Sequence, residues 1–280
     1  MIRRKMMLRL SPAEKLSIQK RPATEDMEAY DFYLRGRYYV ERGDVNSGQQ
    51  MFEKAIELDP AYALAWAGAA DCHSWRSMWF EDSADSLQKA DECSLKALQL
   101  APNRAEAHAS RGLALTMNGK YPEAETEFKS AIELDPQLYE AYYDAGRSYF
   151  AEGKYREAAD AFTQAGVIRP DNVSAATLLS TALKSSGDEK EARKATENAI
   201  KVSDRHLTLH PDDALALSRS ANELITIGEI EEGIERAARG IFDGPTYMPV
   251  QCFLRLRACR DNRTFARFTG RTRQSRRCTP

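Results

Sequence analysis

The stretches Ala131-Ile-Glu-Leu-Asp-Pro136 and Ala165-Gly-Val-Ile-Arg-Pro170 are 34 residues apart and close two segments of the same pattern. Each segment carries a glycine, then Gly-Lys-Tyr, then a phenylalanine, at matching distances: Gly112, Gly119-Lys-Tyr121 and Phe128, then Gly146, Gly153-Lys-Tyr155 and Phe162. Two earlier stretches end alike, at Ala55-Ile-Glu-Leu-Asp-Pro60 and Ala97-Leu-Gln-Leu-Ala-Pro102. Self-similarity at a fixed period indicates a repeat architecture.

Each segment has the features of two helices joined by a tight turn. The closing proline cannot continue a helix, so the second helix ends there. The middle glycine, as in Gly119 or Gly153, allows the turn between the helices. Gly or Ala on the first helix lets the second approach closely, and Phe52, Phe128 and Phe162 fill the space beside that contact. We find no convincing strand, which predicts an all-α protein.

This pattern resembles the tetratricopeptide repeat (TPR), a helix–turn–helix unit of 34 residues. The resemblance implies an α-solenoid of about six TPR units wound as a right-handed superhelix, because one repeat cannot bury its apolar face alone. The second repeat carries about eight extra residues and has Ser94 where others have Phe, and the fifth needs a longer second helix. The register places the repeats over 29–247, at 29–62, 63–104, 105–138, 139–172, 173–213 and 214–247.

Residues 1–28 read as an N-terminal helix and a junction. Ser11-Pro12-Ala13-Glu14 is a capping box with proline at the first helical position, and Pro22 ends that helix. The run from Leu10 to Arg37 resembles the junction into the repeat half of bacterial signalling proteins. Those proteins carry an upstream cyclase-type, TolB-like or winged-helix domain. The resemblance implies a truncated signalling protein that has lost this domain.

The last 33 residues, 248–280, differ from the rest in charge. Residues 1–240 have a net charge of −9, whereas residues 241–280 hold nine arginines, no lysine and two aspartates. Moving the reading frame of Val250–Arg260 forward by one nucleotide can produce a string that fits another repeat. We therefore expect this tail to be disordered or frameshifted. The alternative is a genuine basic tail that binds nucleic acid or an acidic partner.

Composition narrows the class of protein. The mean hydropathy is −0.58, and no run approaches the ~18 apolar residues of a membrane span. Five cysteines without a C-x-x-C pair indicate neither a disulfide framework nor a zinc site. These features predict a cytoplasmic protein that does not bind a membrane.

Motifs for catalysis are missing from the sequence. Gly112, Gly119 and Lys120 look like a phosphate loop only superficially, because the spacing is wrong and Tyr121 stands where Ser or Thr must meet the metal. His206 and His210 share one helical face, but no Glu or Cys of suitable spacing completes a metal site. We expect no enzyme activity, no cofactor and no metal.

The inner wall of the solenoid is the one surface with functional content. The fifth, ninth and twelfth positions of each first helix are expected to face the concave groove. They present two aromatic–arginine pairs, a composition suited to gripping a peptide. The predicted groove residues are Tyr33, Arg37, Asp71, Tyr143, Arg147, Phe150, Thr177, Lys184 and Asn222.

The groove predicts a non-enzymatic scaffold that binds a protein or peptide segment, with an acidic ligand favoured by the arginines. The family's chaperone-tail clamp needs Lys and Asn at two of these positions, and this chain lacks that pattern. The alternative for these side chains is that they only solvate the surface or pack on neighbours.

The second repeat contains all three tryptophans. Trp75 and Trp79 are neighbours on a helical face within its extra residues, and they form a candidate aromatic ridge for a partner. The alternative is that this cluster folds back on its own solenoid.

Overall fold

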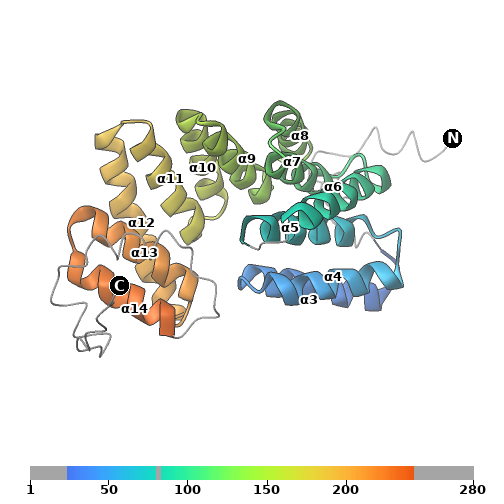
Figure 1. The fold of residues 1–280 in the computed structure, drawn as a ribbon, viewed down its shortest axis with the longest axis horizontal. Helices are drawn as coiled ribbons and strands as arrows, with labels where there is room; N and C mark the ends of the chain where they lie inside the picture. Colours follow the sequence, from blue (N-terminus) through green and yellow to red (C-terminus); the bar gives the residue numbers. More distant parts are fainter. Residues whose placement is uncertain (1–23, 80–82, 243–280) are drawn as a thin grey trace, which may run out of the picture. The chain divides into compact units, whose positions relative to one another are not determined.

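The computed structural model describes residues 24–79 and 83–242. The predicted N-terminal helix within 1–28, up to residue 23, and the arginine-rich tail 248–280 lie outside these residues. All regular secondary structure in the described part of the chain is α-helical, in the helices α3–α14 (Figure 1).

The helices form six consecutive pairs, which confirms the prediction of an all-α protein built from about six TPR helix–turn–helix repeats. In chain order they are α3 (Met27–Glu41), α4 (Val45–Leu58), α5 (Ala63–Trp79), α6 (Ser83–Leu100), α7 (Ala105–Met117), α8 (Tyr121–Leu134), α9 (Tyr139–Glu152), α10 (Tyr155–Ile168), α11 (Val173–Ser185), α12 (Glu189–Leu209), α13 (Ala214–Ile227) and α14 (Ile230–Phe242).

The chain divides into two compact units, Met1–Ile168 and Arg169–Pro280. The N-terminal unit contains the first four described helix pairs, α3–α10, and the C-terminal unit contains α11–α14.

Local sequence signals define where the helices begin and end. Asp26 caps α3, because its carboxylate accepts hydrogen bonds from the backbone N–H groups of Glu28 and Ala29 at 2.9 and 3.0 Å. At the other end of a helix, Gly153 and Gly228 cap α9 and α13 with φ of 86° and 96°. Only glycine adopts this left-handed conformation without a steric penalty, so these two positions allow the turn into the next helix.

Phenylalanine rings on the second helices pack on glycines of the first helices. A Cβ atom added to Gly146 would lie 2.8 Å from Cε1 of Phe162, and one added to Gly112 would lie 2.6 Å from Cε1 of Phe128. Both phenylalanines are buried. The helices of these repeats therefore approach at a distance that only glycine permits.

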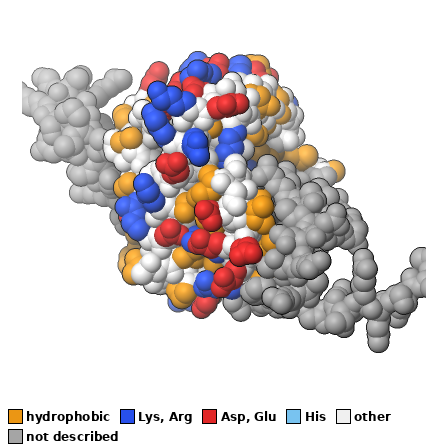
Figure 2. Space-filling view, turned by 90° about the vertical axis from the view of Figure 1, so that its left-hand side faces the viewer, with side chains coloured by type: hydrophobic (Ala, Val, Ile, Leu, Met, Phe, Trp, Pro, Cys, Tyr) orange, Lys and Arg blue, Asp and Glu red, His pale blue; other side chains and the backbone are white. Residues whose placement is uncertain are grey.

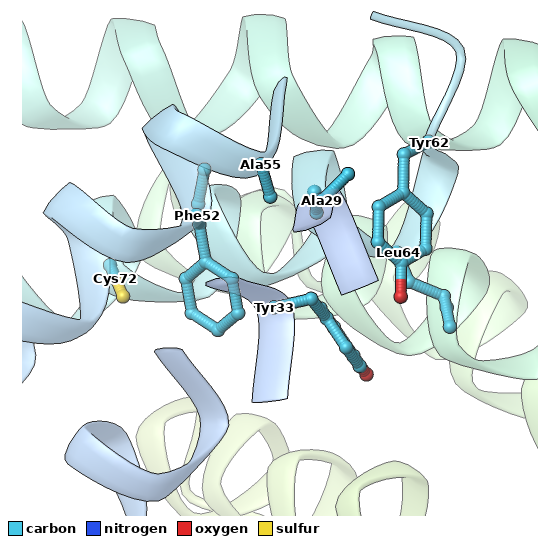
Figure 3. Packing of buried hydrophobic residues seen from close by; sticks show 9 residues of the cluster. Ala29, Tyr33, Phe52, Ala55, Tyr62, Leu64 and Cys72 are labelled. Carbon is cyan, nitrogen blue, oxygen red and sulfur yellow. The ribbon is translucent and has the colours of Figure 1, made fainter. Parts of the chain in front are cut away.

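The core of the first two repeats extends this contact into an aromatic cluster (Figure 3). Phe52 lies between Gly36 and Gly68, and a Cβ added to either glycine would lie 2.6 Å from its ring. The Tyr33 ring lies 5.8 Å from that of Phe52 and 5.2 Å from that of Tyr62. Tyr33 therefore joins α3 to α4 and to Tyr62, the residue that precedes α5.

The second repeat departs from the others in two ways. Its extra residues lengthen both helices, so that α5 has 17 residues and α6 has 18. Ser94 stands where Phe128 stands in the next repeat, and Arg111 of α7 donates a hydrogen bond to its hydroxyl at 3.1 Å. The same guanidinium binds the Asp91 carboxylate at 2.7 Å. The Arg111 guanidinium group therefore lies next to the position that the Phe128 ring occupies in the next repeat.

The C-terminal unit has the longer second helix that the sequence predicted, since α12 spans 21 residues. Its first pair replaces the glycine–phenylalanine contact by a hydrogen bond of 2.7 Å between the buried hydroxyls of Ser180 and Thr196.

The face of the molecule in Figure 2 shows basic and acidic side chains interspersed. On α12, Lys194 forms an ion pair with Glu191 at 2.8 Å.

Candidate functional site

Helices α3 and α9 of the N-terminal unit meet through charged side chains 103 residues apart in sequence. Nη2 of Arg37 lies 3.2 Å from Oε1 of Glu140, and Nη1 of Arg37 donates a hydrogen bond of 3.4 Å to the Tyr33 hydroxyl. Arg37 lies one helical turn after Tyr33, which places both side chains on one face of α3. The first helices of the first and fourth repeats are therefore directly linked.

Helices α5 and α9 meet through a cation–π contact. The guanidinium carbon of Arg147 lies 4.1 Å from the centre of the Trp75 ring and 5.9 Å from that of Tyr143. Trp75 belongs to the part of α5 that the extra residues lengthen, so the insertion supplies the ring that covers Arg147. Arg37, Tyr33, Glu140, Trp75, Tyr143 and Arg147 together are called the arginine–aromatic cluster below.

Two carboxylates lie behind the cluster. Asp71 of α5 accepts a short hydrogen bond from the Ser110 hydroxyl of α7. Burial raises the pKa of Asp71 to about 7, although that hydrogen bond and the charge of Arg37 lower it. An uncharged or partly charged Asp71 is therefore expected near neutral pH.

Asp144 of α9 is the more deeply buried of the two carboxylates. Its Oδ1 lies 3.7 Å from Nη1 of Arg147, which is an ion-pair distance too long for a hydrogen bond, and no hydrogen bond to this oxygen is found in the described part of the chain. Burial raises the pKa of Asp144 to about 8; Arg147 lowers it, whereas Asp71 and Glu140 raise it. The carboxylates of Asp71, Glu140 and Asp144 therefore interact electrostatically with the guanidinium groups of Arg37 and Arg147.

The arginine–aromatic cluster has one ion pair that is partly exposed and one that is mostly buried. The side chains of Arg37 and Glu140 are 37% and 31% exposed, whereas those of Arg147 and Asp144 are 12% and 9% exposed. A ligand arriving from solvent would meet the Arg37–Glu140 pair first.

The predicted groove aromatics lie deeper than their arginine partners. Tyr33 and Tyr143 are buried, and the Tyr143 ring lies 6.1 Å from that of Phe162. Phe150 packs edge-on against Tyr155 at 5.2 Å, in the contact between α9 and α10. The rings therefore stabilise the helix pairs, and Arg37, Glu140 and the half-buried Trp75 form the accessible part of the cluster. The side chain of Trp79 lies outside the described residues.

The other three predicted groove residues, Thr177, Lys184 and Asn222, lie in the C-terminal unit, and two of them make polar contacts between its helices. Lys184 donates to the buried carboxylate of Glu223 at 2.7 Å, and Ser180 donates to the same oxygen at 2.8 Å. The Thr177 hydroxyl is buried and accepts from Arg219 at 3.2 Å. Asn222 is half-buried on α13. Lys184 and Thr177 therefore join α11 to α13 within this unit.

Three of the residues that complete these sites were not among the sequence predictions. Glu140, Asp144 and Glu223 are the acidic partners of the predicted Arg37, Arg147 and Lys184. None of them lies on the helical stripe that the groove prediction used. Asp144 lies three residues before Arg147 on the same helix, so local spacing is a signal for this pair. Glu140 and Glu223 lie 103 and 39 residues from Arg37 and Lys184, and the sequence does not say which distant acid pairs with each cation.

No group of His, Cys, Asp and Glu able to hold a metal ion occurs among the described residues. The two histidines that the sequence placed on one face lie with ring centres 4.8 Å apart. Nε2 of His206 is 2.8 Å from the Asp213 carboxylate.

Of the helices described, none is long and apolar enough to cross a membrane.

A chain of antiparallel helix pairs joined by glycine turns is a helical-repeat protein. A family model described as tetratricopeptide repeat matches residues 33–73, 82–139 and 143–214, which is more than half of the chain, and a second model of the same description matches 115–165. The protein therefore belongs to the tetratricopeptide repeat family. No curated protein sequence matches it.

Solved structures of TPR proteins share this fold at low sequence identity. TTC0263, a thermophilic TPR protein of Thermus thermophilus, is 16% identical, with 70% of this chain and 99% of that chain covered and a TM-score of 0.55. PilW, a type IV pilus biogenesis factor, is 18% identical, with 82% and 99% covered and a TM-score of 0.52. A monomeric mutant of IFIT1 solved with m7Gppp-AAAA is 17% identical, with 72% and 47% covered and a TM-score of 0.56. These similarities concern the fold alone.

Proposed function

We propose that this protein is a non-enzymatic scaffold that binds a polypeptide segment at the arginine–aromatic cluster of its N-terminal unit. The observation that supports this proposal most directly is the Arg37–Glu140 contact of 3.2 Å. It brings two aromatic–arginine pairs from helices far apart in sequence into one site. Aromatic and arginine side chains are the residues that most often dominate the energy of protein interfaces.

The favoured ligand is a segment that presents a carboxylate, either an acidic side chain or a free C-terminus. A guanidinium group binds a carboxylate through two parallel hydrogen bonds. The Glu140 carboxylate is already paired with Arg37. Because the Glu140 side chain is partly exposed, a carboxylate of the ligand can replace it at Arg37. The buried Asp71 and Asp144 favour this exchange when they carry protons, because the site then has an excess of positive charge.

Nucleic-acid binding is the alternative function. The IFIT1 structure was solved with m7Gppp-AAAA, and the basic tail 248–280 was predicted to suit an acidic polymer. Residues 1–240, however, carry a net charge of −9, which opposes the binding of a polyanion. We therefore favour the polypeptide ligand and treat binding of a labelled single-stranded RNA as a competing outcome of the test below.

The proposal predicts that neutralising both arginines weakens peptide binding. Purified protein is used to select ligands from a display library of random short peptides, and selected peptides are then titrated by fluorescence anisotropy. We expect carboxylate-bearing peptides to be selected and the Arg37→Gln/Arg147→Gln double variant to bind them at least about tenfold more weakly, a loss of ~1.4 kcal/mol. Neutral glutamine is preferred to Glu, because a new carboxylate would face Glu140 and Asp144.

Arg35→Gln is the matched control for this experiment. Arg35 lies on the same helix as Arg37, but its side chain is 59% exposed and pairs with Asp31 at 2.7 Å. This control variant should bind the selected peptides as the wild type does. The proposal fails if the double variant retains full affinity, or if only the labelled RNA binds and does so independently of the two arginines.

A further inference from the structure

The sixth and tenth positions of each repeat lie one helical turn apart on one edge of its first helix. In the second, third and fourth repeats both positions hold buried residues, namely Gly68 and Cys72, Ser110 and Ala114, and Asp144 and Ser148. The preceding repeat covers this edge: the Ser110 hydroxyl of α7, for example, donates to the Ala67 carbonyl of α5 at 2.9 Å. This edge is therefore where each repeat stacks on the one before it.

In the first repeat the same edge is exposed and apolar. Its sixth and tenth positions hold Leu34 and Tyr38, which are 46% and 57% exposed. Met27, two turns before Leu34 on the same face of α3, is 74% exposed. An exposed apolar row at a stacking edge indicates a surface that another element covers.

The size of these side chains indicates which kind of element fits. Later repeats place small residues at the edge, such as Gly68 and Ala114, so that helices stack closely. Leu34 and Tyr38 are too large for that spacing. They fit an ordinary helix contact, at about 8–10 Å between axes, with a single amphipathic helix.

We propose that the segment 11–21 of the same chain docks as a helix on the Met27–Leu34–Tyr38 edge of α3. The chain enters α3 at Thr24, whose hydroxyl donates to the Asp59 carboxylate at 2.6 Å. A short connection through Pro22 would place the two helices side by side and antiparallel. A helix over 11–21 has 11 residues, or about 16 Å, and therefore matches the length of the row from Met27 to Tyr38.

Charge and pattern support the same occupant. Ala13, Leu16 and the aliphatic part of Lys20 lie on one side of the expected helix, whereas Ile18 lies on the other. In an antiparallel pair, Lys20 and Arg21 come next to the start of α3. That start is acidic, with Glu25, Asp26, Glu28 and Asp31, so the two elements carry complementary charges.

A double-mutant cycle in the full-length chain tests this contact. Leu16→Ser and Leu34→Ser are made singly and together, and thermal unfolding is followed by tryptophan fluorescence, because all three tryptophans lie in the second repeat. We expect each single change to lower the melting temperature by about 3 °C or more. The double variant should melt close to the lower single variant, because the two residues share one contact.

Ile18→Ser is the matched control, since Ile18 lies on the opposite side of the expected helix. Its effect should add to that of Leu34→Ser. Hydrogen exchange across 27–41 should speed up in Leu16→Ser and stay unchanged in Ile18→Ser. Additive effects of Leu16→Ser and Leu34→Ser would overturn the proposal. A melting temperature that rises with protein concentration, and loses this dependence in Tyr38→Ser, would instead assign the edge to a second copy of the chain.

Discussion

Replacing Gly146 by Leu is expected to lower the unfolding free energy of the N-terminal unit by more than about 3 kcal/mol. Even a single added carbon would lie 2.8–3.0 Å from three atoms of the Phe162 ring. That ring is buried and has no free space to move into, so α9 and α10 must separate or the ring must leave its rotamer. Thermal unfolding followed by tryptophan fluorescence checks this, and the transition should move to a lower temperature.

Gly166→Ala provides the matched control for Gly146→Ala. Both glycines lie within helices of the fourth repeat, but nothing lies within 4 Å of a Cβ added at Gly166. Alanine favours a helix over glycine by about 0.5–1 kcal/mol. The control should therefore raise the melting temperature, whereas Gly146→Ala should lower it. Opposite signs would establish that the packing contact, and not helix propensity, determines the result at Gly146.

A compensating change at the phenylalanine makes the explanation specific. In the Gly146→Leu/Phe162→Ala double variant the space vacated by the ring can accept the leucine. This double variant should be more stable than Gly146→Leu alone, although Phe162→Ala by itself leaves a cavity and is destabilising. If the double variant is no more stable, the clash between these two residues is not the cause of the loss.

Local signals in the sequence were sufficient to predict the helix pairs. A proline after each second helix, a glycine at the turn of every repeat except the second and a capping residue such as Asp26 act over a few residues, so they can be read without knowing the fold. The Phe162–Gly146 contact was also predictable, because the repeat fixes the distance in sequence between its two helices.

Two of the acidic partners, Glu140 and Glu223, could not be predicted, because their contacts depend on how repeats stack rather than on the repeat itself. Arg37 and Glu140 belong to the first and fourth repeats, and their contact depends on the accumulated rotation from one repeat to the next. The position of Trp75 over Arg147 has a similar origin. It depends on the extra length of α5, which the sequence revealed as an insertion without showing whether its tryptophans would face a partner or the chain itself.

Replacing Asp144 by Asn is expected to stabilise the N-terminal unit at pH 8 and to have little stabilising effect near pH 5. Burial raises the pKa of Asp144 to about 8 in the folded protein, whereas an unfolded chain ionises aspartate near pH ~4. Between these values the folded state holds a proton that the unfolded state has lost. The contribution of Asp144 to stability is therefore fully present below about pH 4, decreases as the pH rises, and is lost above about pH 8.

The size of the effect follows from this linkage. One pH unit within the window corresponds to ~1.4 kcal/mol for one group, so the wild type should lose about 2–3 kcal/mol relative to the Asn variant between about pH 5.5 and 7.5. Asn has the shape of a protonated aspartate and carries no charge to desolvate. In the Asn variant Arg147 keeps its contact with Trp75. It loses only the ion pair with the Asp144 carboxylate oxygen, which lies 3.7 Å away.

The difference in melting temperature between Asp144→Asn and wild type, measured from about pH 5 to 8.5, isolates this carboxylate from other titrating groups. Asp160→Asn serves as the control for removing a carboxylate from the same repeat, because Asp160 is exposed to solvent. A pH-independent difference for Asp144→Asn would mean that the carboxylate is ionised in the folded protein throughout. It would also remove the reason for expecting a net positive site near neutral pH, and with it the preference for acidic ligands, while the peptide-binding proposal itself would still depend on Arg37 and Arg147.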